Sequence, residues 1–567
     1  MSLRAQLEAR VHAWVQANYP QVGSGPWVRP CTDTRHGHFQ THFPMVAAKQ
    51  TGGNGRDIAS RLASECPPPP DWENPEVAGG GFVNYRAKPK AVAAALQSLR
   101  GDPAFGISKT AKPENVVVDF SSPNIAKSMH VGHIRSTLLG DTLARMLGRL
   151  GHHVIRINHL GDWGTQFGKL LLAYRAAGRP PIEADRAIEQ LEEFYKKGHQ
   201  EAESDPAKME QARAELAALQ SGDPERRKDW ILFCQRSSEH FREVYRQLGV
   251  HFDMEKGESA YHTELPAMVE ELLRTGIASV SQGAVVVVNP QISEEPFLIR
   301  KSDGAFLYGT TDLAALRSRI RDLKADRIIY VTDGRQQLHF RWLFDTAKKW
   351  GQHAELEHVW FGTILGPDRK PLKSRDGSPI KLSELLHEAK ERAASILREK
   401  RPDLPPNLLN EKAGVLGIAS LKYADQMPGR NLDYVFTWEK LLAFDGNTAP
   451  YILNAYVRTR SILRKANLTS CPNHPFQLEA PEEEELAREL LLYGDAVGLA
   501  AAERKPHHLC GYLYAVAGMY HRFFEACPVL QAPSPALRNS RLTLVGLTGD
   551  VLRDGLALLG IQTLEEM

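Results

Sequence analysis

Two histidines spaced three residues apart form the segment of this sequence best suited to chemistry. His130-Val131-Gly132-His133 follows a polar stretch and opens a predicted helix. The first turn of a helix offers unpaired N–H groups and a partial positive charge to phosphates. Residues three apart share a helical face, so both imidazoles can donate hydrogen bonds to one phosphate chain as charge builds up during a reaction. Gly132 has no side chain, which lets a nucleotide approach the backbone.

The alternative is a pair of surface histidines at a helix cap, which these four residues alone do not exclude. Their surroundings are those of a parallel sheet. Residues 115–120 have the apolar pattern of a buried strand, 132–150 predict a helix, and 153–158 predict a second strand. A strand, a helix and a strand within about 45 residues form a βαβ unit. Ligands bind at the carboxyl ends of strands in such sheets, which is where the two histidines lie.

The chain divides into three predicted parts around this unit. We expect an α/β, Rossmann-like parallel-sheet domain over residues 111–385, with a charged helical insertion at about 175–290. Residues 1–110 predict a small N-terminal α+β domain. Helical patterns interrupted by proline-rich loops dominate residues 386–567 and predict an all-α C-terminal domain.

Further strands and a hairpin complete the predicted sheet regions. Residues 327–331 and 358–361 are apolar enough to extend the parallel sheet, and residues 81–85 predict a short strand in the N-terminal part. Residues 283–308 predict a hairpin region, with Ser302-Asp303-Gly304 as its turn.

The bulk composition describes an ordinary globular protein with several domains, because 567 residues exceed one core. The formal net charge of +2 permits a nucleic-acid partner without requiring one. The six scattered cysteines include no CxxC pair, which argues against disulfides or a structural metal centre and fits a reducing cytoplasm. No stretch reaches the roughly 18 uncharged apolar residues of a membrane span, and the first residues lack a signal-peptide pattern.

The residues before the histidines add specificity. Ser121-Ser122-Pro123-Asn124-Ile125-Ala126-Lys127 leads into His130, and the joined string resembles the ATP-binding signature of class I aminoacyl-tRNA synthetases. Its SSPN-x-AK prefix resembles the arginyl-tRNA synthetases in particular, and Lys127 would add a point charge near the triphosphate. The resemblance covers nearly the whole chain. It includes Gly161-Asp162-Trp163-Gly164-Thr165-Gln166-Phe167-Gly168, Tyr308-Gly309-Thr310-Thr311-Asp312, Gly334-Arg335-Gln336-Gln337-Leu338-His339 and Asp445-Gly446-Asn447-Thr448-Ala449-Pro450-Tyr451.

A second signature of the class is a lysine-rich loop after the last sheet strand. Leu372-Lys373-Ser374-Arg375 matches it loosely and lacks the usual second lysine. Arginyl enzymes often depart from the pattern in this way, so the resemblance implies that Lys373 and Arg375 contact phosphates. Taken alone, such a string is usually an exposed turn.

The resemblance also implies an arginine site. A guanidinium is planar and charged, and carboxylates bind it in a bidentate way. By resemblance, Asp119, Tyr308 and Asp312 would bind the guanidinium, and Ser122, Asn124 and Gln336 would hold the α-amino and carboxylate groups. Tyr308 and Asp312 share a face if residues 308–317 are helical. For an isolated aspartate, a strand end or a helix cap is the better interpretation. Lysine cannot form the same fork, so no editing site is expected.

Both ends of the chain resemble tRNA-binding domains of the same family. The C-terminal part resembles an anticodon-binding domain, in which Tyr451 and Arg458 combine aromatic and basic side chains suited to bases and phosphates. A solvated amphipathic helix is the alternative. The N-terminal part resembles the domain that contacts the tRNA elbow, with Phe82 and Asn84 on its base-contacting strand. An aromatic residue and an asparagine on a short strand are more often structural.

Together these features imply an arginine–tRNA ligase. Its substrates would be L-arginine, ATP with Mg²⁺ and tRNA(Arg), and the family expectation is a cytoplasmic monomer with no tightly bound cofactor and no membrane partner. Adenylate formation would require bound tRNA, by resemblance only. Two alternatives remain: a shorter type of HxGH nucleotidylyltransferase, which lacks the helical C-terminal half, and a catalytically inactive paralogue that binds tRNA or a partner protein.

Overall fold

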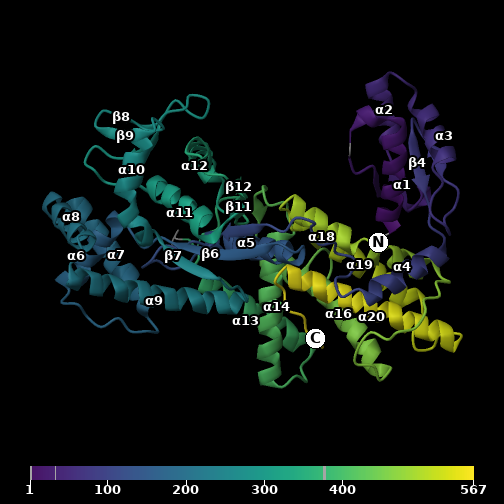
Figure 1. Ribbon diagram of the computed structural model, residues 1–567. Coiled ribbons are helices and arrows are strands. Elements are labelled where there is room, and N and C mark those ends of the chain that lie inside the picture. Colours follow the sequence, from purple (N-terminus) through teal and green to yellow (C-terminus); the bar gives the residue numbers. More distant parts are fainter. Residues whose placement is uncertain (1–2, 24, 32, 374–378) are drawn as a thin grey trace.

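The computed structural model describes residues 3–23, 25–31, 33–373 and 379–567. A parallel sheet occupies the middle of an elongated molecule (Figure 1). The helical insertion lies at one end, and the N-terminal part and the C-terminal helices lie at the other. Among the described helices, none is both long and apolar enough to cross a membrane.

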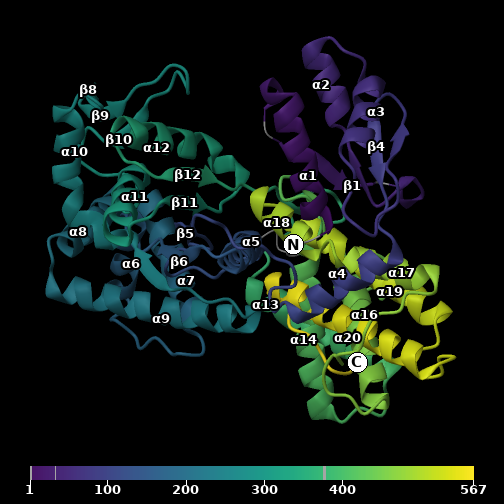
Figure 2. The same ribbon diagram turned by 45° about the vertical axis from the view of Figure 1, so that its right-hand side comes forward.

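The N-terminal part is a four-stranded antiparallel sheet, in the order β1-β2-β4-β3, covered by helices. Arg4 forms a bidentate ion pair with Asp495 (2.6 and 2.7 Å), which ties this part to the C-terminal helices. Figure 2 shows the N-terminal part above the C-terminal helices. Its elements are α1 (Leu3–Asn18), η1 (Pro20–Val22), β1 (Val28–Pro30), η2 (Thr34–His36), β2 (Phe39–Thr41), α2 (Phe43–Thr51), α3 (Gly55–Glu65), β3 (Glu76–Ala78), β4 (Phe82–Tyr85) and α4 (Pro89–Gly101).

The central sheet has five parallel strands in the order β12-β11-β5-β6-β7. Val116 and Val118 of β5 face one apolar layer and Val117 faces the other, because successive side chains of a strand alternate. Burial on both faces explains why this strand is a continuous apolar run. The strands are β5 (Asn115–Asp119), β6 (His153–Leu160), β7 (Met254–Gly257), β11 (Arg327–Tyr330) and β12 (Glu355–His358).

Helix α5 (Val131–Arg149) lies between this sheet and the C-terminal helices. It packs on β5 and β6 and also contacts α13, α14, α18 and α20. Most of its residues are buried, as expected for a helix enclosed on several sides. On the other face of the sheet lie α11 (Tyr308–Leu323), the short η4 (Gly334–Gln336) and α12 (Gln337–Lys349).

Two further regions follow β6 before α11. The first is helical: α6 (Thr165–Ala176), α7 (Ala187–Ser204), α8 (Pro206–Gln220) and α9 (Pro224–Leu248). The second contains η3 (Glu258–Glu264), α10 (Leu265–Arg274) and a small antiparallel sheet of β8 (Ser279–Ser281), β9 (Ala284–Val287) and β10 (Phe297–Arg300).

The C-terminal part is helical, and a short parallel bridge joins it to the central domain. Strand β13 (Ile364–Leu365) pairs with β14 (Tyr434–Val435), which comes from the C-terminal part. The helices are α13 (Leu382–Lys400), α14 (Pro406–Gln426), α15 (Trp438–Leu441), α16 (Ala449–Lys465), α17 (Pro481–Leu490), α18 (Tyr493–Ala502), α19 (His507–Ala526) and α20 (Pro535–Leu558).

The observed strands differ from the expected ones in three places. The strand predicted at 358–361 lies earlier, at Glu355–His358. Edge strand β7 was not predicted, because Met254-Glu255-Lys256-Gly257 is polar. The Ser302-Asp303-Gly304 turn exists, but it follows β10 and closes a bridge between Arg300 and Phe306, whereas residues 288–296 connect β9 to β10.

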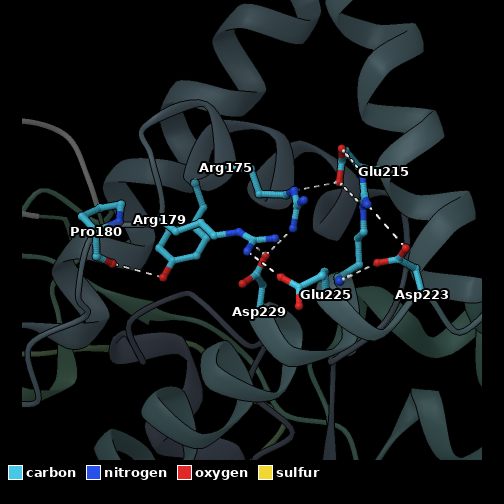
Figure 3. Close-up of polar contacts among 9 residues, drawn as sticks. Arg175, Arg179, Pro180, Glu215, Asp223, Glu225 and Asp229 are labelled. Atoms are coloured by element: carbon cyan, nitrogen blue, oxygen red, sulfur yellow. Dashed lines mark hydrogen bonds and ion pairs between the residues drawn. The ribbon is translucent and has the colours of Figure 1, made fainter.

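Ion pairs hold the insertion helices together (Figure 3). Asp229 of α9 has a side chain only 7% exposed, and its Oδ2 lies 2.8 Å from Nη1 of Arg175 and 3.3 Å from Nε of Arg179. Glu215 of α8 joins the same network through Arg175 and Arg226. Arg175 therefore connects α6 with both α8 and α9.

We expect Asp229→Ala to loosen the insertion without affecting the sheet. It leaves two guanidiniums without their shared acceptor, a loss of about 2 kcal/mol for hydrogen bonds to charged groups. Hydrogen–deuterium exchange in α6, α8 and α9 should become roughly 30-fold faster. The matched control is Glu225→Ala, which removes an exposed partner of Arg179 and should change little. Equal effects of both variants would contradict a specific role of Asp229.

Candidate active site

A cavity of about 690 Å³ opens at the carboxyl ends of the central strands. Strands β5 and β11 are neighbours, but β6 follows on one side and β12 on the other. Such a reversal of strand order is where ligands bind in doubly wound sheets. The cavity wall includes all six residues predicted for substrate binding: Asp119, Ser122, Asn124, Tyr308, Asp312 and Gln336.

The two histidines of the sequence motif form a cap on α5. Nδ1 of His130 accepts a hydrogen bond from the N–H of Gly132, and Nδ1 of His133 accepts one from the N–H of His130, each 3.1 Å long. A neutral imidazole that accepts at Nδ1 carries its proton on Nε2. The two rings lie 4.1 Å apart between centroids, so they offer neighbouring Nε2–H donors.

Both imidazoles are neutral at pH 7. Burial, together with a smaller effect of the neighbouring His130, lowers the pKa of His133 to about 3. Burial also lowers the pKa of His130, with additional effects of Arg335 and Lys127. Arg335 lines the cavity, so the capped helix start lies within electrostatic reach of the cavity wall.

Gly132 has a local role that the sequence argument missed. A Cβ atom at this position would lie 2.8 Å from Cε1 and 2.9 Å from Nδ1 of His130. Any side chain would therefore displace the imidazole from its capping position. The glycine is required by the conformation of His130, before any approach of a nucleotide is considered.

The loop between β5 and α5 has an unusual backbone. Ser121, Ser122 and Ala126 have positive φ angles of 71°, 48° and 61°, which cost energy for residues other than glycine. Side chains from other elements compensate by accepting hydrogen bonds from the loop N–H groups. These acceptors are Ser136 of α5, Asn158 of β6, Ser237 of α9 and Glu192 of α7.

Asp119 faces the cavity with both carboxylate oxygens already partnered. Its Oδ2 lies 2.7 Å from Nη2 of Arg319, whose side chain is 2% exposed. Its Oδ1 accepts a hydrogen bond of 3.0 Å from the Ser122 hydroxyl. The chain thus places a guanidinium of its own next to the carboxylate that was predicted to bind the substrate guanidinium. Sequence reasoning did not single out Arg319.

Asp312 and Tyr308 lie in the first turns of α11, as their shared-face prediction required. Oδ2 of Asp312 lies 2.7 Å from Nε2 of His339, and Oδ1 lies 3.8 Å from Nε2 of His159. Burial opposes ionisation of Asp312, but the His339 hydrogen bond and the nearby positive groups lower its pKa overall. Tyr308 is 63% exposed and lines the cavity.

Glu258 is a further carboxyl group of the cavity wall that the sequence did not reveal. Burial, together with the smaller effects of the neighbouring Asp312 and Asp162, raises its pKa to about 8. Asp162 fixes the adjacent backbone by accepting hydrogen bonds from the N–H (2.8 Å) and hydroxyl (2.6 Å) of Ser259. Within the described chain, no hydrogen bond or ion pair satisfies the Glu258 carboxyl group.

The predicted phosphate contacts lie near the helix start. Nζ of Lys127 lies 4.5 Å from the centroid of the Tyr195 ring. Lys373 is exposed, and its backbone pairs with Pro379. Arg375 lies outside the described residues. The chain returning from this loop pairs Lys381 with His130, and Ile380 accepts a hydrogen bond of 2.8 Å from the N–H of Val131. The lysine loop and the histidine motif are therefore neighbours.

The C-terminal prediction falls on a mixed aromatic and basic surface. Tyr451 and Arg458 lie on α16, seven residues apart and so on one face. The Tyr451 ring lies 5.3 Å from Tyr514 and 4.9 Å from His521, and the Arg458 guanidinium lies 5.2 Å from the Phe524 ring. Sequence reasoning did not find His521 or Phe524, whose partners on α16 are distant in sequence.

The N-terminal prediction falls on β4, an inner strand of its sheet. Phe82 is half-buried, whereas Asn84 is 6% exposed. Access to Asn84 is therefore limited in this conformation.

The fold and the site together define a class of protein. The chain matches the family described as tRNA synthetases class I (R), catalytic domain, over residues 97–438, which contain the parallel sheet, the cavity and the histidine-capped helix. The Arginyl tRNA synthetase N terminal domain matches residues 2–87, and the DALR anticodon binding domain matches residues 452–567. The chain belongs to the arginyl-tRNA synthetase family, which confirms the predicted three-part fold class.

Full-length relatives agree with this assignment. The chain is 43% identical to an arginine–tRNA ligase of Shewanella amazonensis, covering 94% of both chains. It is 41% identical to the one of Thermosynechococcus vestitus, covering 97% of this chain and 96% of the relative. Among solved structures, the arginyl-tRNA synthetase of Plasmodium falciparum has a TM-score of 0.86 at 27% identity and covers 100% of this chain and 99% of its own. The arginyl-tRNA synthetase of Thermus thermophilus has a TM-score of 0.83 at 26% identity, and the match covers 100% of both chains.

We expect His130 and His133 to remain neutral, with the proton on Nε2, across physiological pH. The reason is that each Nδ1 accepts a backbone hydrogen bond and burial opposes the charged form. Side-chain ¹⁵N NMR should show two Nε2–H tautomers that do not titrate between about pH 6 and 8, assigned by difference with His130→Asn and His133→Asn. Titration of either ring in this range would contradict the cap geometry.

Proposed function

We propose that this chain is an arginine–tRNA ligase. It converts L-arginine and ATP to arginyl-adenylate and pyrophosphate, and then transfers arginine to the 3′-terminal ribose of tRNA(Arg). The observation that supports this most directly is the joint arrangement of an acidic cavity and a histidine-capped helix start at one strand end. The cavity suits a cationic side chain, and the helix start suits a triphosphate.

The arginine side chain would enter the acidic part of the cavity. Asp312 and Glu258 are the carboxyl groups best placed to form ion pairs with its guanidinium, and the Tyr308 ring would cover it. Asp119 is already paired with Arg319, so we propose that its carboxylate binds the substrate guanidinium and the Arg319 guanidinium together. Ser122, Asn124 and Gln336 would bind the α-amino and carboxylate groups, which leaves the carboxylate directed toward ATP.

The first step is an attack by the arginine carboxylate oxygen on the α-phosphorus of ATP, with pyrophosphate as the leaving group. His130 and His133 would donate hydrogen bonds from Nε2 to the phosphates, and Gly132 would leave the helix start open. Lys127, Lys373 and Arg375 would neutralise the charge that develops on pyrophosphate. ATP would bind as its Mg²⁺ complex, and positioning supplies most of the acceleration.

The second step needs tRNA bound with its 3′ end in the cavity that holds the adenylate. The ribose hydroxyl attacks the adenylate carbonyl, and AMP leaves. Tyr451 and Arg458 would contact the anticodon region of the tRNA, through base stacking and phosphate pairing. Phe82 and Asn84 would contact the tRNA elbow. We further propose that the enzyme is a cytoplasmic monomer, that tRNA is needed for the first step, and that its domains span residues 1–110, 111–385 and 386–567.

ATP–pyrophosphate exchange with each amino acid, with and without tRNA(Arg), tests the proposed function. We expect exchange with arginine, and rejection of lysine by roughly 10⁴-fold or more because it would leave buried carboxylates underpaired. Exchange supported by another amino acid would refute the specificity. Absence of exchange together with tRNA binding would instead favour an inactive paralogue.

The raised pKa of Glu258 gives a pH dependence. A bound guanidinium favours the ionised carboxylate, so below about pH 8 arginine binding must release the Glu258 proton. The KM for arginine should therefore fall by up to about tenfold per pH unit as pH rises toward 8, and level off above it. In Glu258→Gln the KM should be higher and should lose this slope. Steady-state ATP–pyrophosphate exchange at saturating ATP, repeated across this pH range, measures the KM for arginine.

The matched control is Glu295→Gln, because Glu295 also lines the cavity. This variant should keep the slope of the unmodified enzyme. A Glu258→Gln variant with an unchanged slope would show that another group titrates.

A further inference from the structure

We propose that Arg135 is a positioning residue that fixes the described part of the lysine loop, residues 362–373 and 379–381, relative to the histidine motif. We also propose that its pairing with Asp425 makes this arrangement depend on the C-terminal helices. The proposal rests on the proposed function, because it concerns the two elements assigned to ATP. It assigns a role to a buried charge that takes no part in the chemistry described above.

The guanidinium of Arg135 lies where three segments meet. Its side chain is 3% exposed, and Nη1 donates hydrogen bonds to the carbonyl oxygens of Gly362 (2.7 Å) and Leu432 (3.2 Å). Its Nε lies 3.2 Å from Oδ1 of Asp425 on α14. One side chain of α5 thus contacts the base of the lysine loop, the segment before β14 and a C-terminal helix.

Gly362 marks the point from which the loop departs. It directly precedes Thr363 and β13, and the loop then continues to Lys373. A Cβ at position 362 would lie 2.7 Å from the backbone of Leu432, so this approach requires glycine. The N–H of Thr363 donates to Asp433 (2.6 Å). The loop base is therefore held by Arg135 and by the C-terminal part. Its preceding residue is also held by the central domain, where the carbonyl oxygen of Phe361 accepts a hydrogen bond of 3.1 Å from the N–H of Gly334.

The loop is also joined to α5 at its other end. Residues 379–381 return beside the helix start, where Val131 and Leu382 form backbone hydrogen bonds of 2.8 Å with Ile380 and Met129. The helix therefore contacts both ends of the loop: its first residue contacts the returning strand, and Arg135 contacts the base. A rigid helix with two such contacts defines where Lys373 lies relative to His130.

Asp425 is the partner that comes from the C-terminal part. Its side chain is 4% exposed, and it also accepts a hydrogen bond of 3.1 Å from the Tyr434 hydroxyl. Burial raises the pKa of Asp425, and Arg135 counteracts this effect. Helix α14 packs on α16, which carries Tyr451 and Arg458, so a displacement of the candidate tRNA-binding helix can reach Asp425.

The energetics favour a positional role. Replacing a buried ion pair by apolar side chains of similar volume is often neutral or stabilising, so such a pair is a poor device for stability alone. A guanidinium has five donors in a rigid fork, which fixes several oxygens in direction as well as distance. Apolar contacts would allow α5 and the loop base to slide.

The test uses Asp425→Asn and the apolar pair Arg135→Met/Asp425→Leu in the full-length enzyme. In ATP–pyrophosphate exchange, we expect each to raise the KM for ATP and to lower kcat by about tenfold or more, with the KM for arginine within about twofold. The double variant should keep the thermal midpoint of the unmodified enzyme, which separates positioning from stability.

The matched control is Glu357→Gln. Glu357 pairs with the buried Arg504 across the same junction (3.1 Å), and no contact of that pair with the loop base is present among the described residues. It should leave the KM for ATP unchanged. A double variant with unmodified KM and kcat, or parallel increases of both KM values, would overturn the proposal.

Hydrogen exchange gives a readout that needs no activity. Peptides covering residues 359–366 should exchange hydrogen faster in Asp425→Asn than in Glu357→Gln. The reason is that Arg135 then holds Gly362, the neighbour of Thr363, less firmly. Equal hydrogen exchange in the two variants would overturn the proposal, even if no amino acid supported ATP–pyrophosphate exchange. If the unmodified enzyme is inactive but the two variants differ in hydrogen exchange as expected, the proposed function is refuted and the positioning role of Arg135 is not.

Discussion

The irregular backbone between β5 and α5 is the constraint on which the rest of the site depends. Three of its residues have left-handed conformations, and its N–H groups find acceptors on side chains of four other helices and strands. These acceptors are separated widely along the chain, so the loop acquires its shape only when the sheet, the insertion and α5 are assembled. The same loop directs Ser122 and Asn124 to the cavity and places His130 on the helix start.

The charges around this loop are separated by type. On the cavity side, Asp312 is held ionised by its histidine neighbours, Asp119 is balanced by Arg319, and Glu258 retains a proton more readily than usual. On the helix side, His130 and His133 are neutral donors. In the proposed reaction this separation orients arginine, because its cationic end is attracted to one side while its carboxylate faces the phosphates.

Sequence patterns predicted the elements that repeat regularly and missed what tertiary contacts decide. Apolar runs identified β5, β6 and β11, and motif resemblance selected six residues that the structure brings to one cavity. Arg319 escaped notice because an arginine in an amphipathic helix is usually solvated. Glu258 follows the polar edge strand β7, where no periodic signal exists. The roles of the site residues, the domain limits and the phosphate contact assigned to Arg375 stay predictions.

The position of α5 between the sheet and the C-terminal helices explains how distant parts can act on one site. Residues two apart on a helix point about 200° from each other, so His133 and Arg135 face opposite sides. One side belongs to the candidate ATP site and the other to the junction with α14. A helix transmits displacement nearly unchanged along its length, whereas a packed junction adopts discrete arrangements. A shift of α14 that alters the Arg135 contacts must therefore alter the distance between His130 and the loop of Lys373.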